Sequence, residues 1–314
     1  MELRQLRYFV AIADSGSLTK AAEQVFVAQS ALSHQLAQLE AELGASLFER
    51  SRRGVVLTDA GQRFIPHAVA ILRQADEARA SVRADEREPE GKVIVGIPHS
   101  VSHALALPLL RAVRARYPQV VLELTEELTG NLTRQLRTGQ IQLAVLFDDG
   151  QLSGFLVNRV LVEQLSLIEP ALSRSRPRKA KTSITLKQAL SRPLILPASP
   201  HGVRPLIEQA AAQAGYPQPP VEADISSISI LRTTLLAGMG RTLLPVMPLW
   251  PEIQSGALTA RPVRQLARTL AICSSADIPR SLACQAVARL ADNVMRQLSV
   301  SGAWVDAQPW EGSA

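Results

Sequence analysis

The stretch "AQSALSHQLAQLE", residues 28–40, carries two kinds of side chain at helical spacing. Leu32, Leu36 and Leu39 fall at i, i+4 and i+7, which places them on one side of a predicted helix. The opposite side of that helix carries short, neutral, hydrogen-bonding groups: Gln29, Ser30, Ser33 and His34. A helix that needs only solubility usually presents Lys and Glu on its outer face. The sequence therefore raises the question of what this neutral face contacts.

The residues before this helix predict a helix-turn-helix arrangement. In "LRQLRYFVAIAD", residues 3–14, apolar side chains recur at helical spacing, and Gly16 ends the segment. Ser17 is a suitable N-cap for a second short helix, "LTKAAEQVF", residues 18–26. Two short helices joined by a tight turn, the second with small polar residues outward, are typical of this motif.

The residues that follow predict a small hairpin and then a long helix. Residues 47–48 and 55–57 are short β-like runs, and "ERSRRG" between them forms a wing with a cationic tip. Thr58 is a suitable N-cap for a helix that runs from residue 59 to about residue 87. The apolar stripe of this helix suits pairing with another helix. Its members are Phe64, Ala68, Ile71, Ala75, Ala78 and Val82.

From Lys92 onward the chain alternates between strand and helix patterns. "KVIVGI", "ALALPLLRAVRARYP", "VVLELTEE", "NLTRQLRTGQ" and "IQLAVLFDD" read as strand, helix, strand, helix and strand. This order predicts a parallel sheet with helices on its faces. A second series follows, and it ends with a strand at "TLAICSS" (269–275) and a helix from about residue 281. The tail "GAWVDAQPWEGSA" is expected to be disordered.

Length and composition indicate an ordinary globular protein. The 314 residues suffice for two or three folded units, and 46% hydrophobic residues supply their cores. No run of about 18 apolar residues predicts a membrane span, and the first ten residues lack a signal peptide's apolar region. We therefore expect a cytoplasmic protein whose two cysteines, Cys273 and Cys284, are reduced thiols.

Net charge alone does not locate a nucleic-acid site. The whole chain has a formal charge of +6. Residues 1–90 nevertheless hold 11 cationic residues against 13 anionic ones. The local arrangement of side chains must therefore decide. The most basic run, residues 173–183, is more simply explained as a solvated loop than as a second DNA contact.

Residues 6–61, from "LRYFVAIADSGSLTKAAEQVF" to "GVVLTDAG", resemble the N-terminal domain of LysR-type transcriptional regulators. "GQIQLAVLFDD" and "GMGRTLLP" resemble signatures of the same family's effector-binding module, which is built like a small periplasmic binding protein. "ISSISILRTTLLAGMGRTLLP" is similar to the nitrogen assimilation control branch in particular. The resemblance covers roughly residues 2–300 and implies an α/β protein with an N-terminal winged helix-turn-helix.

The resemblance implies four parts in the chain. These are a DNA-binding domain (1–58), a linker and dimerisation helix with a hinge (59–90), an effector-binding domain (91–300) and a tail (301–314). Within the effector domain, lobe 1 comprises about 91–160 with 266–300, and lobe 2 about 161–265. The implied assembly is a homodimer or homotetramer on double-stranded operator DNA, with RNA polymerase as a further candidate partner.

In this family the third helix lies in the DNA major groove, so the resemblance assigns base contacts to Gln29, Ser30, Ser33 and His34. A Gln amide can make a bidentate pair with adenine. His34 departs from the family, which commonly has Arg there, and this puts a guanine contact in doubt. The wing would meet phosphates or the minor groove through Arg50, Arg52 and Arg53.

The second module should hold a small, anionic effector between its lobes. "GIPHSVS" follows the first strand and opens a helix, whose backbone N–H groups can meet an anion. The predicted effector residues come from both lobes and from the crossings between them: Ser100, Ser102, Asp148, Ser199, His201, Arg204, Ser226 and Ser227. The alternatives are that these residues are ordinary caps and that the regulator acts without a small ligand.

Other functions have weaker support in the sequence. His99, His103 and His201 suggest a metal site only loosely, and no cofactor motif is present. "GIPHSVS" is not a nucleophile elbow, and no phosphate-binding loop occurs, so we expect no enzyme. A redox switch at the two cysteines is disfavoured by their apolar contexts. A solute-binding module without DNA binding would predict a damaged recognition helix or wing.

Overall fold

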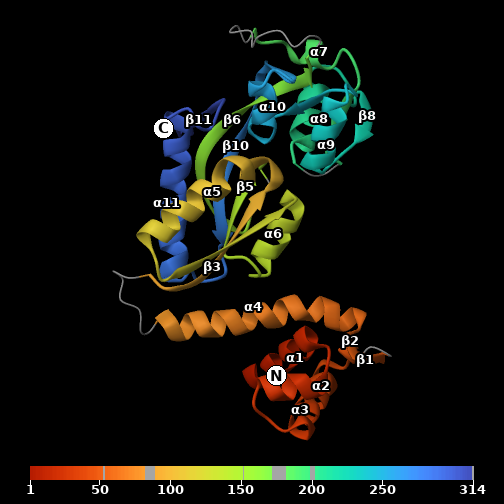
Figure 1. Ribbon diagram of the computed structural model, residues 1–314, viewed down its shortest axis with the longest axis vertical. Helices are drawn as coiled ribbons and strands as arrows, with labels where there is room; N and C mark the ends of the chain where they lie inside the picture. The colour runs from red at the N-terminus through yellow and green to blue at the C-terminus, as the bar shows by residue number, and fades with distance from the viewer. Residues whose placement is uncertain (52–53, 82–88, 151, 172–181, 199–201, 313–314) are drawn as a thin grey trace. The chain divides into compact units, whose positions relative to one another are not determined.

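The computed structural model describes residues 1–314 except 52–53, 82–88, 151, 172–181, 199–201 and 313–314. Contacts divide the chain into an N-terminal unit, residues 1–85 with 137–140, and a C-terminal unit that comprises the remainder (Figure 1). The predicted winged helix-turn-helix and the predicted α/β fold are both confirmed. Within the predicted linker and hinge (59–90), residues 82–88 lie outside the described residues.

The N-terminal unit is a three-helix domain with a two-stranded wing and a long fourth helix. Its elements are α1 (Leu3–Ser15), α2 (Leu18–Gln24), α3 (Gln29–Leu43), β1 (Phe48–Ser51), β2 (Gly54–Leu57) and α4 (Asp59–Ser81). The caps follow the sequence, because Ser17 accepts from the Lys20 N–H and Thr58 accepts from the Gly61 N–H. Leu32, Leu36 and Leu39 are buried, as the spacing predicts.

Close backbone contacts fix the wing against the helices. The Val55 N–H donates to the carbonyl of Gly16, the residue that ends α1. A Cβ at Gly54 would lie 2.5 Å from that carbonyl oxygen, and one at Gly61 would lie 2.1 Å from the Leu47 oxygen. Only glycine permits approaches of this kind. The geometry of the wing therefore depends on these two positions.

The apolar stripe of α4 has two different environments. Phe64, Ala68 and Ile71 belong to the core of the N-terminal unit, where Ala68 is fully buried. Ala78, nearer the other end of the helix, is exposed. The first half of the stripe predicted for pairing with a second chain is therefore occupied within its own unit. Val82 lies outside the described residues.

Lobe 1 of the C-terminal unit is a sheet with helices on both faces (Figure 1). It begins with β3 (Gly91–Pro98), α5 (His99–Arg116), β4 (Val120–Glu127), α6 (Thr129–Arg137) and β5 (Leu143–Phe147). Strand β3 pairs in parallel with both β4 and β5, as predicted. Leu143 and Val145 pack with α5 and α11 (Leu282–Val300) on one face, whereas Ala144 packs with α6 on the other.

Lobe 2 has a core of its own, which holds Leu165, Leu196 and Leu235 among others. Its smaller elements are α7 (Leu186–Ala189), β7 (Leu194–Leu196), α8 (Arg204–Gln213), β8 (Val221–Asp224), α9 (Ile228–Leu236), β9 (Thr242–Leu244), η1 (Met247–Leu249) and α10 (Trp250–Gln254). Strand β9 joins the large sheet by pairing with β6.

Two long strands, β6 (Phe155–Pro170) and β10 (Leu258–Ser275), pair antiparallel and run through both lobes. The sequence prediction placed only residues 269–275 in a strand, so the first part of β10 is a correction. A register shift between Pro262 and Ala267, with Gln265 at φ 58°, interrupts the apolar alternation there. The Gln164 amide donates to the carbonyls of Val263 and Leu266, and thereby supplies hydrogen-bond donors to the backbone of the shifted segment.

The C-terminal segment is ordered over residues 301–312, and the predicted disordered tail is therefore wrong for these residues. Strand β11 (Ala307–Pro309) pairs with β6. Trp304 is 1% exposed, and its Nε1 donates to Glu163 at 2.9 Å. Aromatic burial of this size contributes strongly to stability, and it outweighs the polar composition of the tail.

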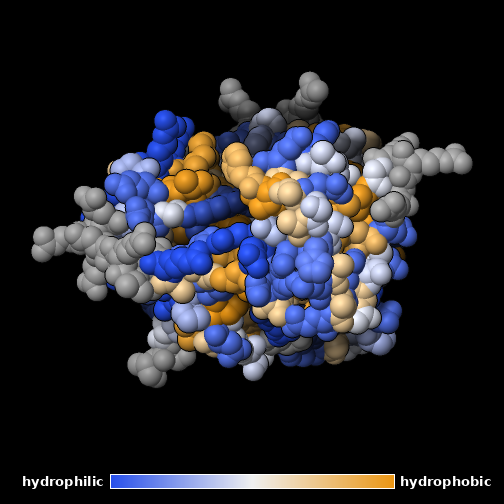
Figure 2. Space-filling view, turned by 90° about the horizontal axis from the view of Figure 1, so that it is seen from below, coloured by the Kyte–Doolittle hydropathy of each residue, from blue (hydrophilic) through white to orange (hydrophobic). Residues whose placement is uncertain are grey.

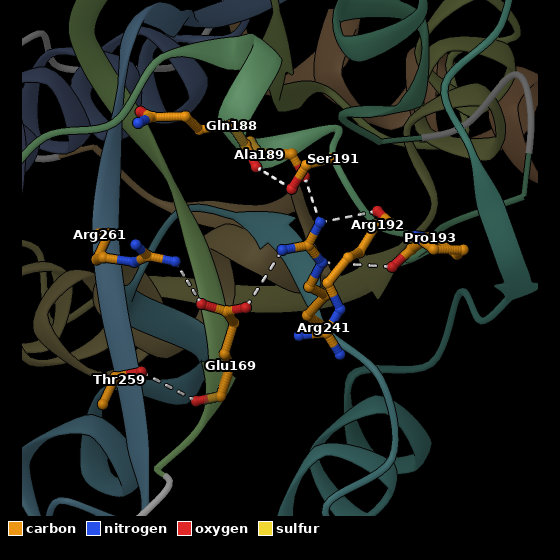
Figure 3. A network of polar contacts seen from close by, with 9 residues as sticks. All are labelled: Glu169, Gln188, Ala189, Ser191, Arg192, Pro193, Arg241, Thr259 and Arg261. Carbon is orange, nitrogen blue, oxygen red and sulfur yellow. Dashed lines mark hydrogen bonds and ion pairs between the residues drawn. The ribbon is translucent and has the colours of Figure 1, made fainter.

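A buried arginine organises the polar contacts of lobe 2 (Figure 3). Arg241 is 4% exposed and donates to the carbonyls of Ala189 and Arg192, each at 2.8 Å. It also pairs with Glu169 at 3.3 Å. The same carboxylate pairs with Arg261 at 2.7 Å, and the Arg261 side chain is 46% exposed. The two arginines therefore share one carboxylate but differ in burial.

This difference predicts unequal effects of two matched substitutions on stability. Arg241→Met leaves buried carbonyls without donors, so we expect the free energy of unfolding to fall by about 3 kcal/mol. Arg261→Met removes a solvent-screened pair and should lower it by less than about 1 kcal/mol. Urea denaturation followed by circular dichroism measures both values. Equal losses for the two variants would contradict the structural role of Arg241.

Candidate functional site

The outer face of α3 carries the residues that the sequence predicts for base contacts. Gln29, Ser30 and His34 are exposed, and Ser33 is half-buried. His34 Nε2 lies 3.1 Å from the Gln38 amide nitrogen. The role of each ring nitrogen in this contact depends on the tautomer of His34. Figure 2, a space-filling view, shows hydrophilic residues together with groups of hydrophobic ones on the surface.

The N-terminus of α3 has no side-chain cap, because Ala28 occupies the N-cap position. Its first backbone N–H groups therefore have no acceptor from that side chain, and such groups bind anions well. The predicted phosphate contacts are described only in part. Arg50 lies in β1 opposite Val55, whereas Arg52 and Arg53 fall outside the described residues.

Sequence reasoning missed Phe26, which lies in the turn between α2 and α3. Phe26 is 94% exposed and has a φ of 57°. A bulky residue in the left-handed region is a strained exception, and such strain is concentrated at functional sites. The sequence pattern placed Phe26 at the end of the second helix (18–26), whereas α2 ends at Gln24, so helical spacing did not indicate its exposure.

The first two predicted effector residues lie at the start of α5 and have partners. Ser100 Oγ accepts a hydrogen bond from Arg268 Nη2 at 3.0 Å. Ser102 Oγ donates to Glu126 at 3.0 Å, and the same carboxylate lies 2.8 Å from Nδ1 of His99. His99 is the first residue of α5.

Ser100 is linked to a buried ion pair that the sequence did not reveal. Glu163 is fully buried and Arg268 is 5% exposed, and they oppose each other on β6 and β10. Arg268 Nη2 lies 2.6 Å from the Glu163 carboxylate, and the guanidinium stacks 4.0 Å from the centre of the Phe147 ring. Burial lowers the pKa of Arg268, while the charge of Glu163 opposes that shift. Residues more than 100 positions apart form this pair, so periodicity could not find it.

Four of the remaining predicted effector residues have structural partners of their own. Asp148 pairs with Arg159, and Arg204 pairs with Asp224. Ser226 Oγ accepts from the Ala198 N–H, and Ser227 caps α9. Ser199 and His201 lie outside the described residues.

The basic side chains described in these segments already lie beside carboxylates. His99 is next to Glu126, and Arg204 also pairs with Glu208. Arg232, on α9, pairs with Glu252 at 3.1 Å and lies 3.5 Å from His103 Nε2. A bound anion would therefore compete with carboxylates that are already in place. Backbone N–H groups and hydroxyls at the start of α5 remain as its binding groups.

The alternatives of a metal site and a redox switch gain no support from the described residues. Within them, no group of three His, Cys, Asp or Glu residues is placed to hold a metal. Cys273 and Cys284 are buried, and burial together with the charge of Asp148 raises the pKa of Cys273 to about 12. This thiol is therefore protonated and poorly nucleophilic at neutral pH. No helix in the described part of the chain is long and apolar enough to cross a membrane.

Comparison with protein families gives two matches that together cover most of the chain. Residues 3–62 match the family model for bacterial regulatory helix-turn-helix proteins of the lysR family. Residues 86–296 match the model for the LysR substrate binding domain. The predicted family is therefore confirmed.

Individual relatives and structures agree with these matches. The nitrogen assimilation regulatory protein nac of Klebsiella aerogenes is 36% identical over 246 residues, 78% of each chain. The regulator BbuR of Bordetella bronchiseptica is 29% identical and covers 95% of this chain and 91% of its own. A full-length OxyR variant from Pseudomonas aeruginosa has a TM-score of 0.70 at 25% identity and covers 100% of this chain and 99% of its own. The structure of CbnR complexed with its target DNA has a TM-score of 0.65 at 22% identity, and the match covers 94% of this chain and 100% of the CbnR chain. At this identity the likeness supports only the fold.

A helix-turn-helix unit with an exposed third helix, followed by a two-lobed α/β unit that matches a substrate-binding domain, defines a regulator and not an enzyme. The chain belongs to the LysR family of DNA-binding transcriptional regulators.

Proposed function

We propose that α3 inserts into the major groove of operator DNA and reads base edges through Gln29, Ser30, Ser33 and His34. The observation that carries this proposal is an outer helix face of short, neutral, hydrogen-bonding groups, three of them exposed. Base edges present closely spaced donors and acceptors that such groups can match. A guanine presents two acceptors in the major groove. His34 can donate one hydrogen bond to them, whereas an arginine at this position could donate two.

Phosphate contacts would position the domain on the duplex. Arg50, Arg52 and Arg53 of the wing supply cations, and the uncapped N-terminus of α3 supplies backbone N–H groups. Residues 1–90 have an excess of two anionic residues, so binding depends on a few correctly placed cations. Each neutralised phosphate contributes roughly 0.9 to the salt slope.

The operator would be bound by a two-fold dimer, or by a tetramer built from two dimers. The second half of α4 supports this proposal, because Ala78 in the predicted apolar stripe is exposed. Two-fold symmetry requires two half-sites separated by whole helical turns of DNA.

Base-reading and phosphate-binding residues should respond differently to substitution. Gln29→Ala removes a base contact and should reduce discrimination between the operator and a mutated operator by about tenfold. Arg53→Ala should weaken binding to both duplexes alike, because phosphates carry no sequence information. Gel-shift titrations on the two duplexes at one salt concentration measure this. If both variants bind as the wild type does, the assignment of α3 to the groove is wrong.

Phe26 adds an apolar contact to this proposed interface. Its position two residues before Ala28 puts it next to the N-terminus of α3, and an exposed aromatic can contact sugars or a thymine methyl group. Such a contact would account for a residue that is both strained and exposed.

Stability and DNA affinity should therefore change in opposite directions at this position. Phe26→Asn relieves the left-handed strain, so we expect the free energy of unfolding to rise by about 1 kcal/mol. The same change should weaken operator binding by about tenfold if the ring contacts DNA. Phe26→Tyr is the matched control and should retain binding. A stabilised Asn variant with unchanged affinity would show that the ring does not contact DNA.

We also propose a small anionic effector held between the lobes, beside Ser100 and Ser102. The substrate-binding domain of the family and the link from Ser100 to the buried Arg268–Glu163 pair support this. Because the surrounding cations are paired, hydroxyls and the N-terminus of α5 must supply most of the affinity. The preference for an anion over its neutral isostere should then be small.

Calorimetry on small carboxylates and aromatic acids, each with its amide, tests the effector proposal. We expect at least one acid to bind, and Ser100→Ala to weaken it by about tenfold because a direct hydrogen bond is lost. Arg114→Ala, on the far end of α5, is the control and should not change binding. No binding by any compound would favour the alternative, a regulator that acts without a small ligand.

A further inference from the structure

A cavity lies in lobe 1, and neither Ser100 nor Ser102 lines it. Its volume is about 680 Å³, within the range of small-molecule sites. The walls are one face of α11 and the ends of β6 and β10, which α11 packs against (Figure 1). A hydrogen bond from Asn158 to Asp292 joins the strand wall to the helix wall at 3.0 Å.

The cavity contains a buried hydroxyl that lacks a partner. Ser274 lines the cavity and is 3% exposed, and its Oγ has no hydrogen-bond partner among the described residues. An unsatisfied buried hydroxyl destabilises a fold, and most buried polar groups are paired. That oxygen has almost no exposed surface, so a ligand in the cavity would meet it only if the Ser274 side chain turned toward the cavity.

The lining combines apolar surface with unpaired positive charge. Leu143, Ile272 and Ala288 supply apolar surface. Arg280 and Arg289 line the same cavity with exposed side chains, and neither forms an ion pair in the described part of the chain. The carboxylate of Asp292, by contrast, is already paired with Arg296 at 3.0 Å. The free charge at the cavity is therefore positive.

We propose that this cavity binds a small organic acid with an apolar body, as a second ligand site separate from the inter-lobe cleft. The carboxylate of the ligand meets Arg280 and Arg289, whose guanidinium groups can each hold a carboxylate in bidentate fashion. The apolar body packs against Leu143, Ile272 and Ala288. Ligand binding would brace the first part of β6 against α11.

Calorimetry of the full chain with octanoate, and with octanamide as the neutral probe, tests this site. We expect saturable octanoate binding that weakens by about tenfold or more in Arg280→Ala/Arg289→Ala, because both cationic partners are lost. Octanamide should bind the wild type correspondingly less well. Ala288→Phe should abolish binding by filling the cavity, and its folding is checked by circular dichroism.

Two control variants locate the bound probe. Arg111→Ala/Arg114→Ala removes the same charge from exposed positions on α5 and should leave octanoate affinity unchanged. Ser100→Ala should also leave it unchanged, since that residue belongs to the proposed inter-lobe site. The proposal is overturned by equal affinity in the wild type and the Arg280/Arg289 double variant, by loss of binding in Ser100→Ala, or by no saturable binding of octanoate.

Discussion

The antiparallel pairing of β6 with β10 is the constraint on which the C-terminal unit depends. These strands pass through both lobes, and the buried Glu163–Arg268 pair links one strand to the other. The pair extends to Ser100 at the start of α5 and to Trp304 of the C-terminal segment. A buried charge left without its partner is strongly destabilising, so each half of this pair holds the other in place. The proposed effector residue Ser100 is thereby fixed to the element that joins the lobes.

The N-terminal unit has to bind DNA without a large net positive charge. Residues 1–90 are slightly acidic, so long-range attraction to DNA is limited. Under the function proposed above, recognition therefore relies on hydrogen-bonding groups on α3, an uncapped helix N-terminus and the arginines of the wing. The buried leucines of α3 hold that face outward, and the Gly16–Gly54 contact fixes the wing beside it.

The sequence predicted those parts of the structure that depend on neighbouring residues, such as the spacing of apolar side chains and the caps of helices. Leu32, Leu36 and Leu39 indicated the burial of α3, and Ser17 and Thr58 indicated the starts of two helices. Prediction failed where distant residues decide the outcome. The first part of β10 was not predicted because the register shift at Pro262 breaks the alternation of apolar residues. The order of residues 301–312 was not predicted because Trp304 is buried by strands far away in sequence.

The candidate sites were predictable to a similar, limited extent. Residue type and spacing predicted the polar face of α3, and the resemblance assigned Ser100 and Ser102 to the effector site, which stays a prediction. Neither could foresee that Arg204 is paired with Asp224, or that a strained Phe26 is exposed next to α3. Pairing partners and backbone strain are properties of the folded chain, and single-sequence patterns do not contain them.

The central claim is that neutral groups on α3 distinguish base sequences. The most direct measurement is fluorescence anisotropy of the purified wild-type protein with a duplex recovered by genome-wide binding and with a scrambled duplex of equal length and composition. At one fixed salt concentration, we predict an affinity ratio of about 10³ or more in favour of the recovered duplex. Equal affinity for the two duplexes would contradict the claim.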